Sequence, residues 1–179
     1  MLKSAASPPI RENQVKKKKD GTPLPPEPTR PASDSCVGDY MTRNVTTLTD
    51  QSRLLDAALL IRRTGKRHVP IVDEAGRAVG IISDRDVSRM APSMLSRMTP
   101  DEYNQIFEAT PITVAMTKNP ITVRPDLPIR DAVTMLYQKK IGAIIVTEND
   151  QVVGILTVTD MLALLNALLS EGKSSSATA

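Results

Sequence analysis

The sequence predicts a mixed α/β (α+β) fold that is built from two copies of one small βαββα unit. The clearest support is self-similarity, because MTRNVTTL at residues 41–48 returns as MTKNPITV at residues 116–123, 75 positions later. The segment AVGIISDRD at residues 78–86 likewise returns as VVGILTVTD at residues 152–160, at a spacing of 74. Since structural repeats tolerate length changes in turns, the second copy is expected to have one turn that is shorter by a residue.

Each copy has the same order of predicted elements. Apolar residues at helical spacing begin near Leu54 in the first copy and near Ile129 in the second, where Pro128 suits a first helical turn. Gly65 and Gly142 lie where these helices are expected to stop. Apolar runs at residues 69–72 and 78–82, and at residues 143–146 and 152–156, then predict two strands and a tight turn per copy. The pattern afterwards becomes helical again.

The chain is expected to divide into five parts. Thr99, Pro100 and Glu102 supply an N-cap, a proline at the first position and an acid three residues on, which predicts a short helix through about Phe107. Residues 1–34 are rich in proline, contain four consecutive lysines and have few large apolar side chains, so they are expected to be disordered. The predicted parts are a tail (1–34), a first repeat (35–92), an ordered linker (93–110), a second repeat (111–170) and a disordered tail (171–179).

Composition disfavours several classes of protein. One cysteine, Cys36, and one histidine, His68, cannot form an intramolecular disulfide or a Cys/His metal cluster, which favours a cytoplasmic protein. The apolar stretch at residues 161–169 covers only about half of the ~20 residues that a membrane span needs. The four lysines at residues 16–19 account for the net charge of +3, so the folded part is nearly neutral and nucleic-acid binding is not expected. Acidic residues are absent before Glu12, so the N-terminal segment is also compatible with an organellar transit peptide.

A Gly-x-x-Ser/Thr-x-x-Asp motif occurs twice, each time where a predicted strand meets a predicted helix. It consists of Gly80, Ser83 and Asp86 in the first copy and of Gly154, Thr157 and Asp160 in the second. One interpretation is a helix capping box, in which the hydroxyl and the acid satisfy free backbone N–H groups. The other is a nucleotide grip, because glycine permits close approach to the backbone and a helix start attracts anions. The duplication favours the second interpretation.

These features together resemble a tandem pair of CBS (cystathionine-β-synthase-type) domains, often called a Bateman module, as in stand-alone CBS domain-containing proteins. The resemblance covers residues 37–169 and rests on the duplicated motif and on the sequence RHVPIVD at residues 67–73. It implies two repeats packed about a pseudo-twofold axis, with adenosine nucleotides or S-adenosylmethionine bound in clefts between them. Each ligand would take its ribose contact from one repeat and its adenine contacts from the other.

The resemblance implies two sites, which we call the first and second predicted sites. In the first, the second repeat supplies Thr157 and Asp160 for phosphate and ribose. The first repeat supplies an adenine lining of Thr46, Thr47, Val69 and Pro70, and the basic phosphate contacts Arg67 and His68. The second would use Ser83, Asp86, Ile121, Thr122, Ile144 and Ile145. It has Gly142 and Ala143 at the positions of Arg67 and His68, which puts its phosphate affinity in doubt. Arg85 could serve either ligand.

Some of these residues have structural alternatives. His68 could be only a partly buried strand residue, and Arg67 and Arg85 could be solvated surface charges. The methionines are expected to fill gaps in the core; they are Met90, Met94, Met98, Met116, Met135 and Met161.

The sequence therefore predicts a non-enzymatic sensor that binds AMP, ADP, ATP or S-adenosylmethionine as a regulatory ligand, requires no cofactor and acts on an unknown protein target. No P-loop, dinucleotide fingerprint or nucleophile–base pair points to an enzyme. The alternative is a structural or dimerisation adaptor, with weak nucleic-acid binding through the basic tail. Self-association through the predicted apolar helices suggests a homodimer.

Overall fold

The computed structural model describes residues 34–90 and 99–171. Residues 1–33 of the predicted N-terminal tail with its four lysines, residues 172–179 of the predicted C-terminal tail, and Met94 and Met98 of the linker region lie outside the described residues. The first repeat contains β1 (Leu48–Thr49), α2 (Leu54–Thr64), β2 (His68–Val72), β3 (Ala78–Ser83) and α3 (Asp84–Met90). The second contains β5 (Thr122–Val123), α5 (Ile129–Lys139), β6 (Ala143–Glu148), β7 (Gln151–Thr157) and α6 (Val158–Glu171). Glu171, which the sequence assigns to the C-terminal tail, ends α6 instead.

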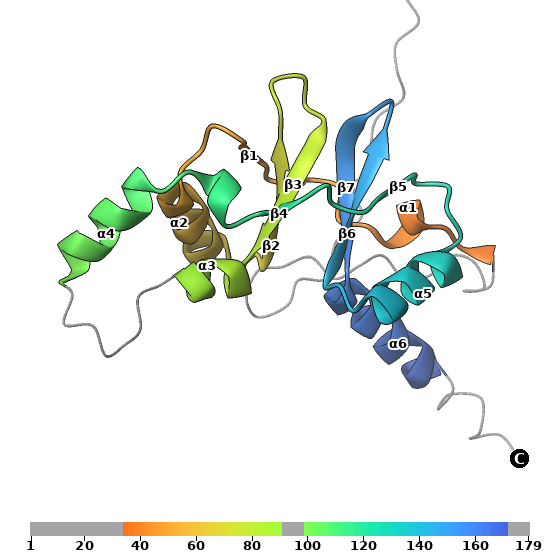
Figure 1. The fold of residues 1–179 in the computed structure, drawn as a ribbon. Helices are drawn as coiled ribbons and strands as arrows, with labels where there is room; N and C mark the ends of the chain where they lie inside the picture. Colours follow the sequence, from red (N-terminus) through yellow and green to blue (C-terminus); the bar gives the residue numbers. More distant parts are fainter. Residues whose placement is uncertain (1–33, 91–98, 172–179) are drawn as a thin grey trace, which may run out of the picture.

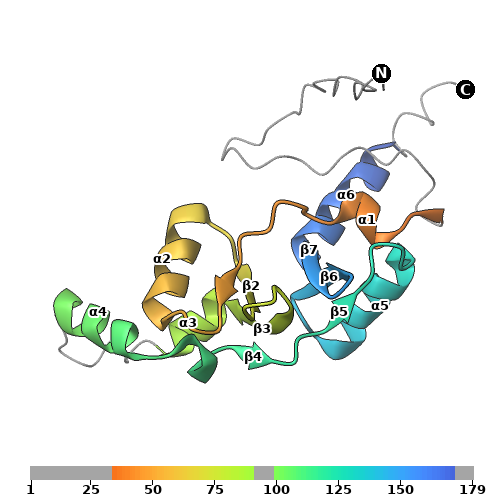
Figure 2. The same ribbon diagram turned by 90° about the horizontal axis from the view of Figure 1, so that it is seen from above.

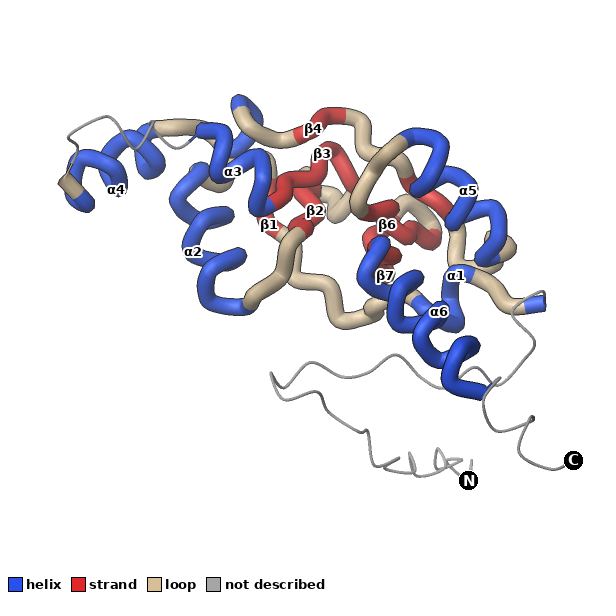
Figure 3. The backbone as a smooth tube through the Cα atoms, turned by 90° about the horizontal axis from the view of Figure 1, so that it is seen from below, coloured by secondary structure: helices blue, strands red, loops and turns tan. Residues whose placement is uncertain are grey.

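The described chain is layered, with strands in the middle and helices outside. β2 pairs in parallel with β1 and antiparallel with β3, and β6 pairs in the same way with β5 and β7. Figures 1 and 2 show the two sheets side by side, with α2, α3 and α4 (Pro100–Ala109) beyond one sheet and α1 (Val37–Tyr40), α5 and α6 beyond the other. The tube in Figure 3 shows the same order of layers from below. The mixed α/β fold with two repeats is confirmed.

The two halves exchange short segments. Thr42, which precedes the first repeat's strands, exchanges backbone hydrogen bonds of 2.9 and 3.0 Å with Ile155 in β7 of the second repeat. Reciprocally, β4 (Thr117–Lys118), which precedes the second repeat's strands, pairs with β3 of the first, where Thr117 is opposite Ile81. Thr42 and Thr117 are 75 positions apart. Each repeat therefore completes the sheet of the other, as a pseudo-twofold relation requires.

The helical segments before Thr42 and Thr117 also pack against the opposite repeat. Val37 and Tyr40 of α1 are buried in the core of the second repeat. Ile112, in the 3-10 helix Ile112–Val114, and Phe107 of α4 are buried in the core of the first. Each hydrophobic core therefore includes residues that precede the other repeat in the sequence.

The local turn chemistry mostly follows the sequence. Gly65 ends α2 in a left-handed conformation with φ of 67°, and Thr99 caps α4 while the Thr99 N–H donates to Glu102 at 2.7 Å. The equivalent pairs Val72–Ala78 and Thr147–Val152 enclose residues 73–77 in the first hairpin and residues 148–151 in the second, which accounts for the lost residue. Glu148 and Gln151 form one further pair in the second hairpin. The expectation for Gly142 is wrong, because α5 already ends at Lys139 and Lys140 adopts the left-handed conformation with φ of 53°.

Candidate functional site

The two Ser/Thr-x-x-Asp elements form the same hydrogen bonds in both repeats. Asp86 Oδ2 accepts from the Ser83 hydroxyl at 2.6 Å and from the Ser83 N–H at 2.9 Å. Asp160 Oδ2 accepts from the Thr157 hydroxyl at 2.7 Å and from the Thr157 N–H at 2.8 Å. In each case the acid's own N–H donates back to the hydroxyl at 3.3 Å. Both elements are therefore reciprocal helix caps at a strand-to-helix junction, and a ligand role would be added to that capping role.

The glycines of the two motifs are approached by methionine side chains. A Cβ atom on Gly80 would overlap the sulfur of Met116, with the Met116 Cγ only 3.1 Å away. A Cβ atom on Gly154 would overlap the sulfur of Met41, whose Cγ would also lie at 3.1 Å. Both contacts cross from one repeat to the segment that precedes the other. The close approach that the sequence assigned to a ligand thus belongs, at these glycines, to a methionine.

His68 joins the two repeats at the end of the sheets where both motifs lie. In β2, His68 is opposite Ser83, the capping hydroxyl of the first motif. Its ring packs over Gly142 of the second repeat, where a Cβ atom would come within 2.6 Å of the His68 Nε2. The Gly142 carbonyl accepts from the N–H of Val158 at 3.0 Å, next to Thr157. Gly142 therefore provides the space that His68 needs between the two motifs.

Four charged side chains surround His68. Burial lowers the pKa of His68 below its ordinary value of 6.5, and it outweighs Asp84 and Asp86, which raise the pKa. Arg67 and Arg85 lower it further. The ring is therefore mainly neutral at neutral pH.

Acidification is expected to weaken the fold through His68. Because the folded-state pKa lies below the unfolded value of 6.5, the unfolded chain binds the proton more readily, so stability is lost as the pH falls from 6.5 toward the folded-state pKa. Urea unfolding of the wild type and of His68→Gln across this range measures the effect. The wild type should lose more stability on acidification than the variant; parallel curves would show that His68 is not responsible.

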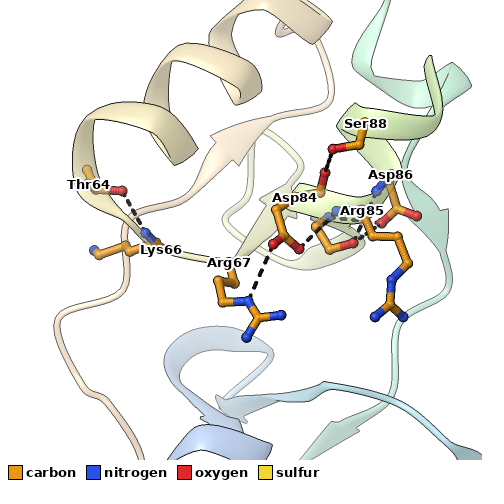
Figure 4. Close-up of polar contacts among 8 residues, drawn as sticks. Thr64, Lys66, Arg67, Asp84, Arg85, Asp86 and Ser88 are labelled. Carbon is orange, nitrogen blue, oxygen red and sulfur yellow. Dashed lines mark hydrogen bonds and ion pairs between the residues drawn. The ribbon is translucent and has the colours of Figure 1, made fainter. Parts of the chain in front are cut away.

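Arg67 and Arg85 both extend from the first repeat near its β3–α3 junction (Figure 4). Arg67 Nε is 3.4 Å from Asp84 Oδ2, and both side chains are substantially exposed. Figure 4 shows the Arg67 and Arg85 side chains extending on the same side of the β3–α3 junction, toward the ribbon of the second repeat. Positive charge from the first repeat thus faces the second repeat (Figure 4).

The residues expected to line adenine divide between the two faces of the strands. Val69 and Ile144 are fully buried in the helix-facing cores of their own repeats. Pro70 and Ile145 are also fully buried, but they alternate with those residues and so face the other sheet. A ligand contact of Val69 or Ile144 would therefore have to use its backbone.

The remaining lining residues precede the strands. Thr46, Thr47 and Ile121 are partly buried, and Thr122 is exposed and lies opposite Ile145 in the register of β5 and β6. Lys66 was not among the predicted residues, although its Nζ donates to the Thr46 hydroxyl at 2.6 Å. The sequence feature that could have indicated Lys66 is the basic run Lys66-Arg67-His68, because its counterpart in the second repeat is Ile141-Gly142-Ala143.

The part of the chain that the structure describes contains neither a metal-binding cluster nor a membrane-spanning helix. Within residues 34–90 and 99–171, no three His, Cys, Asp or Glu side chains are placed to hold a metal ion. Over the same residues, none of the helices has both the length and the apolar character needed to cross a membrane.

The arrangement of the repeats and their duplicated motifs matches a known family. The family model described as CBS domain matches residues 37–92 and 112–167, and the chain belongs to this family as a tandem CBS domain pair. A solved structure of a putative acetoin utilization protein from Vibrio cholerae is 30% identical, with a TM-score of 0.62, and the match covers 78% of this chain and 96% of that one.

A second solved structure is the CBS domain pair of protein MJ0100 in complex with 5′-methylthioadenosine and S-adenosyl-L-methionine. It is 25% identical, with a TM-score of 0.61 and coverage of 75% of this chain and 98% of that one. The curated relative MJ1225 of Methanocaldococcus jannaschii, an uncharacterized protein, is 31% identical over 129 residues, which are 70% of this chain and 45% of the relative. The chain also matches 24% of the length of a homoserine O-acetyltransferase from Methanohalobium evestigatum. It therefore spans between about a quarter and about a half of the first curated relatives it matches.

Proposed function

We propose that this chain is a non-enzymatic regulatory module that binds an adenosyl ligand between its two repeats and acts on a partner protein. The observation that carries the proposal is the contact of His68 with Gly142. In this contact His68, at the end of a basic run, lies against Gly142, whose carbonyl accepts from the N–H of Val158, next to Thr157. A ligand bound there would contact both repeats, so its binding energy could favour one packing of the repeats over another.

The charges of the first predicted site favour a phosphorylated ligand such as AMP, ADP or ATP. Arg67 and Arg85 are permanently charged donors that suit phosphate oxygens, and both influence the His68 environment. A phosphate beside His68 would favour the protonated ring and raise its pKa. The second predicted site lacks a matching basic run, because its counterpart is Ile141-Gly142-Ala143. It would suit an adenosyl ligand without phosphate groups.

The MJ0100 relative supports the ligand class, because that CBS domain pair holds two adenosyl compounds. We infer that the chemistry of the site is recognition, since the Ser83 and Thr157 hydroxyls and their acids are engaged with each other in helix caps. The basic side chains offer hydrogen bonds and charge to a ligand.

Thermal unfolding against AMP, ADP, ATP, GTP, S-adenosylmethionine and NAD tests the proposal. A ligand at about one hundred times its dissociation constant adds roughly 2.7 kcal/mol, which shifts the midpoint by several degrees. An upward shift with an adenine nucleotide, larger than that with GTP, is the expected result. A midpoint that no adenosyl compound moves would instead favour a purely structural role for the two motifs.

The alternative of a dimerisation adaptor has its own observation. α6 runs over 14 residues, and one of its faces exposes large apolar side chains. Their exposed fractions are 60% for Leu162, 50% for Leu165 and 65% for Leu169. Such a stripe is typical of a helix that packs against a partner, so we propose a homodimer. Light scattering should give twice the chain mass for the wild type and a lower mass for Leu165→Gln. A wild type that is monomeric at micromolar concentration would contradict the homodimer.

A further inference from the structure

Lys66 makes a contact that ties it to the first predicted site. It follows Gly65 at the end of α2, and its partly buried side chain donates from Nζ to the Thr46 hydroxyl at 2.6 Å. Thr46 lies between Thr42, which pairs with the second repeat, and β1 of the first. In Figure 4 the Lys66 side chain extends away from Arg67, toward this segment. The ammonium group is thus at the edge of the proposed site.

The second repeat provides an internal comparison for this pair. The residues 75 positions later are Ile121 and Ile141, and both pack against the hydrophobic core of the second repeat. The same fold therefore accepts an apolar pair at these two positions. A lysine there costs side-chain entropy and the partial desolvation of an ammonium group, so the fold alone gives no reason for it.

Lys66 also differs from the other basic residues nearby in its partners. The ion pairs formed among the described residues join Arg67 to Asp84, Arg77 to Asp73, Arg89 to Asp86 and Arg124 to Asp126. None of them includes Lys66, so no carboxylate of the described chain lies within 4.0 Å of its ammonium group. Thr46 offers a neutral oxygen only. A partly buried ammonium group with a neutral partner retains a strong attraction for an anion.

We propose that Lys66 is a phosphate-binding residue of the first predicted site and makes that site selective for phosphorylated over unphosphorylated adenosyl ligands. This inference rests on the proposed function. Thr46 holds the ammonium group at the edge of the site, and the phosphate of a bound nucleotide provides the anionic partner that residues 34–90 and 99–171 do not. Because Lys66 acts as a point charge, its contribution grows with the charge of the ligand. The second site, with Ile141, lacks this selectivity.

Calorimetric titration with AMP and with adenosine tests the inference on the wild type, Lys66→Gln and the double variant Thr46→Ile/Lys66→Ile, which copies the second repeat. Loss of one charge-assisted contact should weaken AMP binding about tenfold, while adenosine binding changes by less than about twofold. Lys139→Gln, an exposed lysine on α5, is the control for net charge and should leave both affinities unchanged.

Each of the other outcomes overturns the inference in a recognisable way. Equal losses for AMP and adenosine would assign Lys66 to the base or to the fold, and unchanged AMP binding would remove its role while leaving the proposed function intact. If the wild type binds neither compound, the proposed function and this inference fail together. Unfolding midpoints of the double variant close to that of the wild type would show that the fold is retained.

Discussion

Replacing Phe107 with alanine is expected to lower the free energy of unfolding by about 3–5 kcal/mol, because it removes a large, fully buried ring from a packed core. Phe107 lies on α4, between the two repeats in the sequence, yet it packs in the core of the first repeat. Its ring stacks on Tyr103 with centroids 4.2 Å apart and an interplanar angle of 25°. The linker helix is therefore part of the folded unit.

Chemical denaturation of Phe107→Ala and Ile106→Ala gives a matched comparison. Ile106 is the preceding residue of the same helix, but 44% of it is exposed, so its replacement should cost much less, on the order of 0.5–1 kcal/mol. Similar losses for both variants would contradict the burial of Phe107 and the docking of α4 on the first repeat.

Replacing Gly154 with valine is expected to destabilise the protein by about 1–3 kcal/mol or more. At an open position in a strand valine would be favourable, since β-branched residues suit strands. Here a Cβ atom on Gly154 would overlap the sulfur of Met41, which is itself buried and cannot move into solvent. The loss would therefore come from the contact between the second repeat and the exchanged segment of the first.

A double-mutant cycle separates this contact from other effects of the substitution. Met41→Ala alone should cost about 2–5 kcal/mol, but it removes the side chain that blocks a residue at position 154. The double variant Gly154→Val/Met41→Ala should therefore be more stable than the sum of the single losses predicts. Simple additivity would contradict the packing of Met41 over Gly154. Gly80 and Met116 should show the same coupling, because their contact is equivalent.

The repeats, their strands and most helix ends could be predicted from the sequence, because they depend on local patterns. The apolar runs around Val69 and Ile144, the cap at Thr99 and the turn at Gly65 each specify a structure within a few residues. Even the turn that lost a residue was indicated by the change in repeat spacing.

The contacts between the repeats could not be predicted in the same way, because no local pattern specifies them. The pairing of Thr42 with Ile155 joins residues more than a hundred positions apart. Met41 and Met116 contact the opposite repeat, but their sequence positions are equally compatible with packing in the core of the repeat that follows each of them. Gly142 was interpreted as a helix stop, whereas it makes space for His68. No local pattern singles out Lys66, because its contact is with Thr46, which lies 20 positions away.

Calorimetric titration of AMP into the wild type, Asp160→Asn and Asp86→Asn tests the central claim most directly. Asparagine retains an oxygen that can cap the helix, so folding should be preserved while the charged acceptor for a ribose is lost. The account predicts that AMP binds the wild type, that Asp160→Asn weakens this binding at least about tenfold, and that Asp86→Asn affects it less. Equal affinity in all three proteins, or no binding to the wild type, would contradict the account.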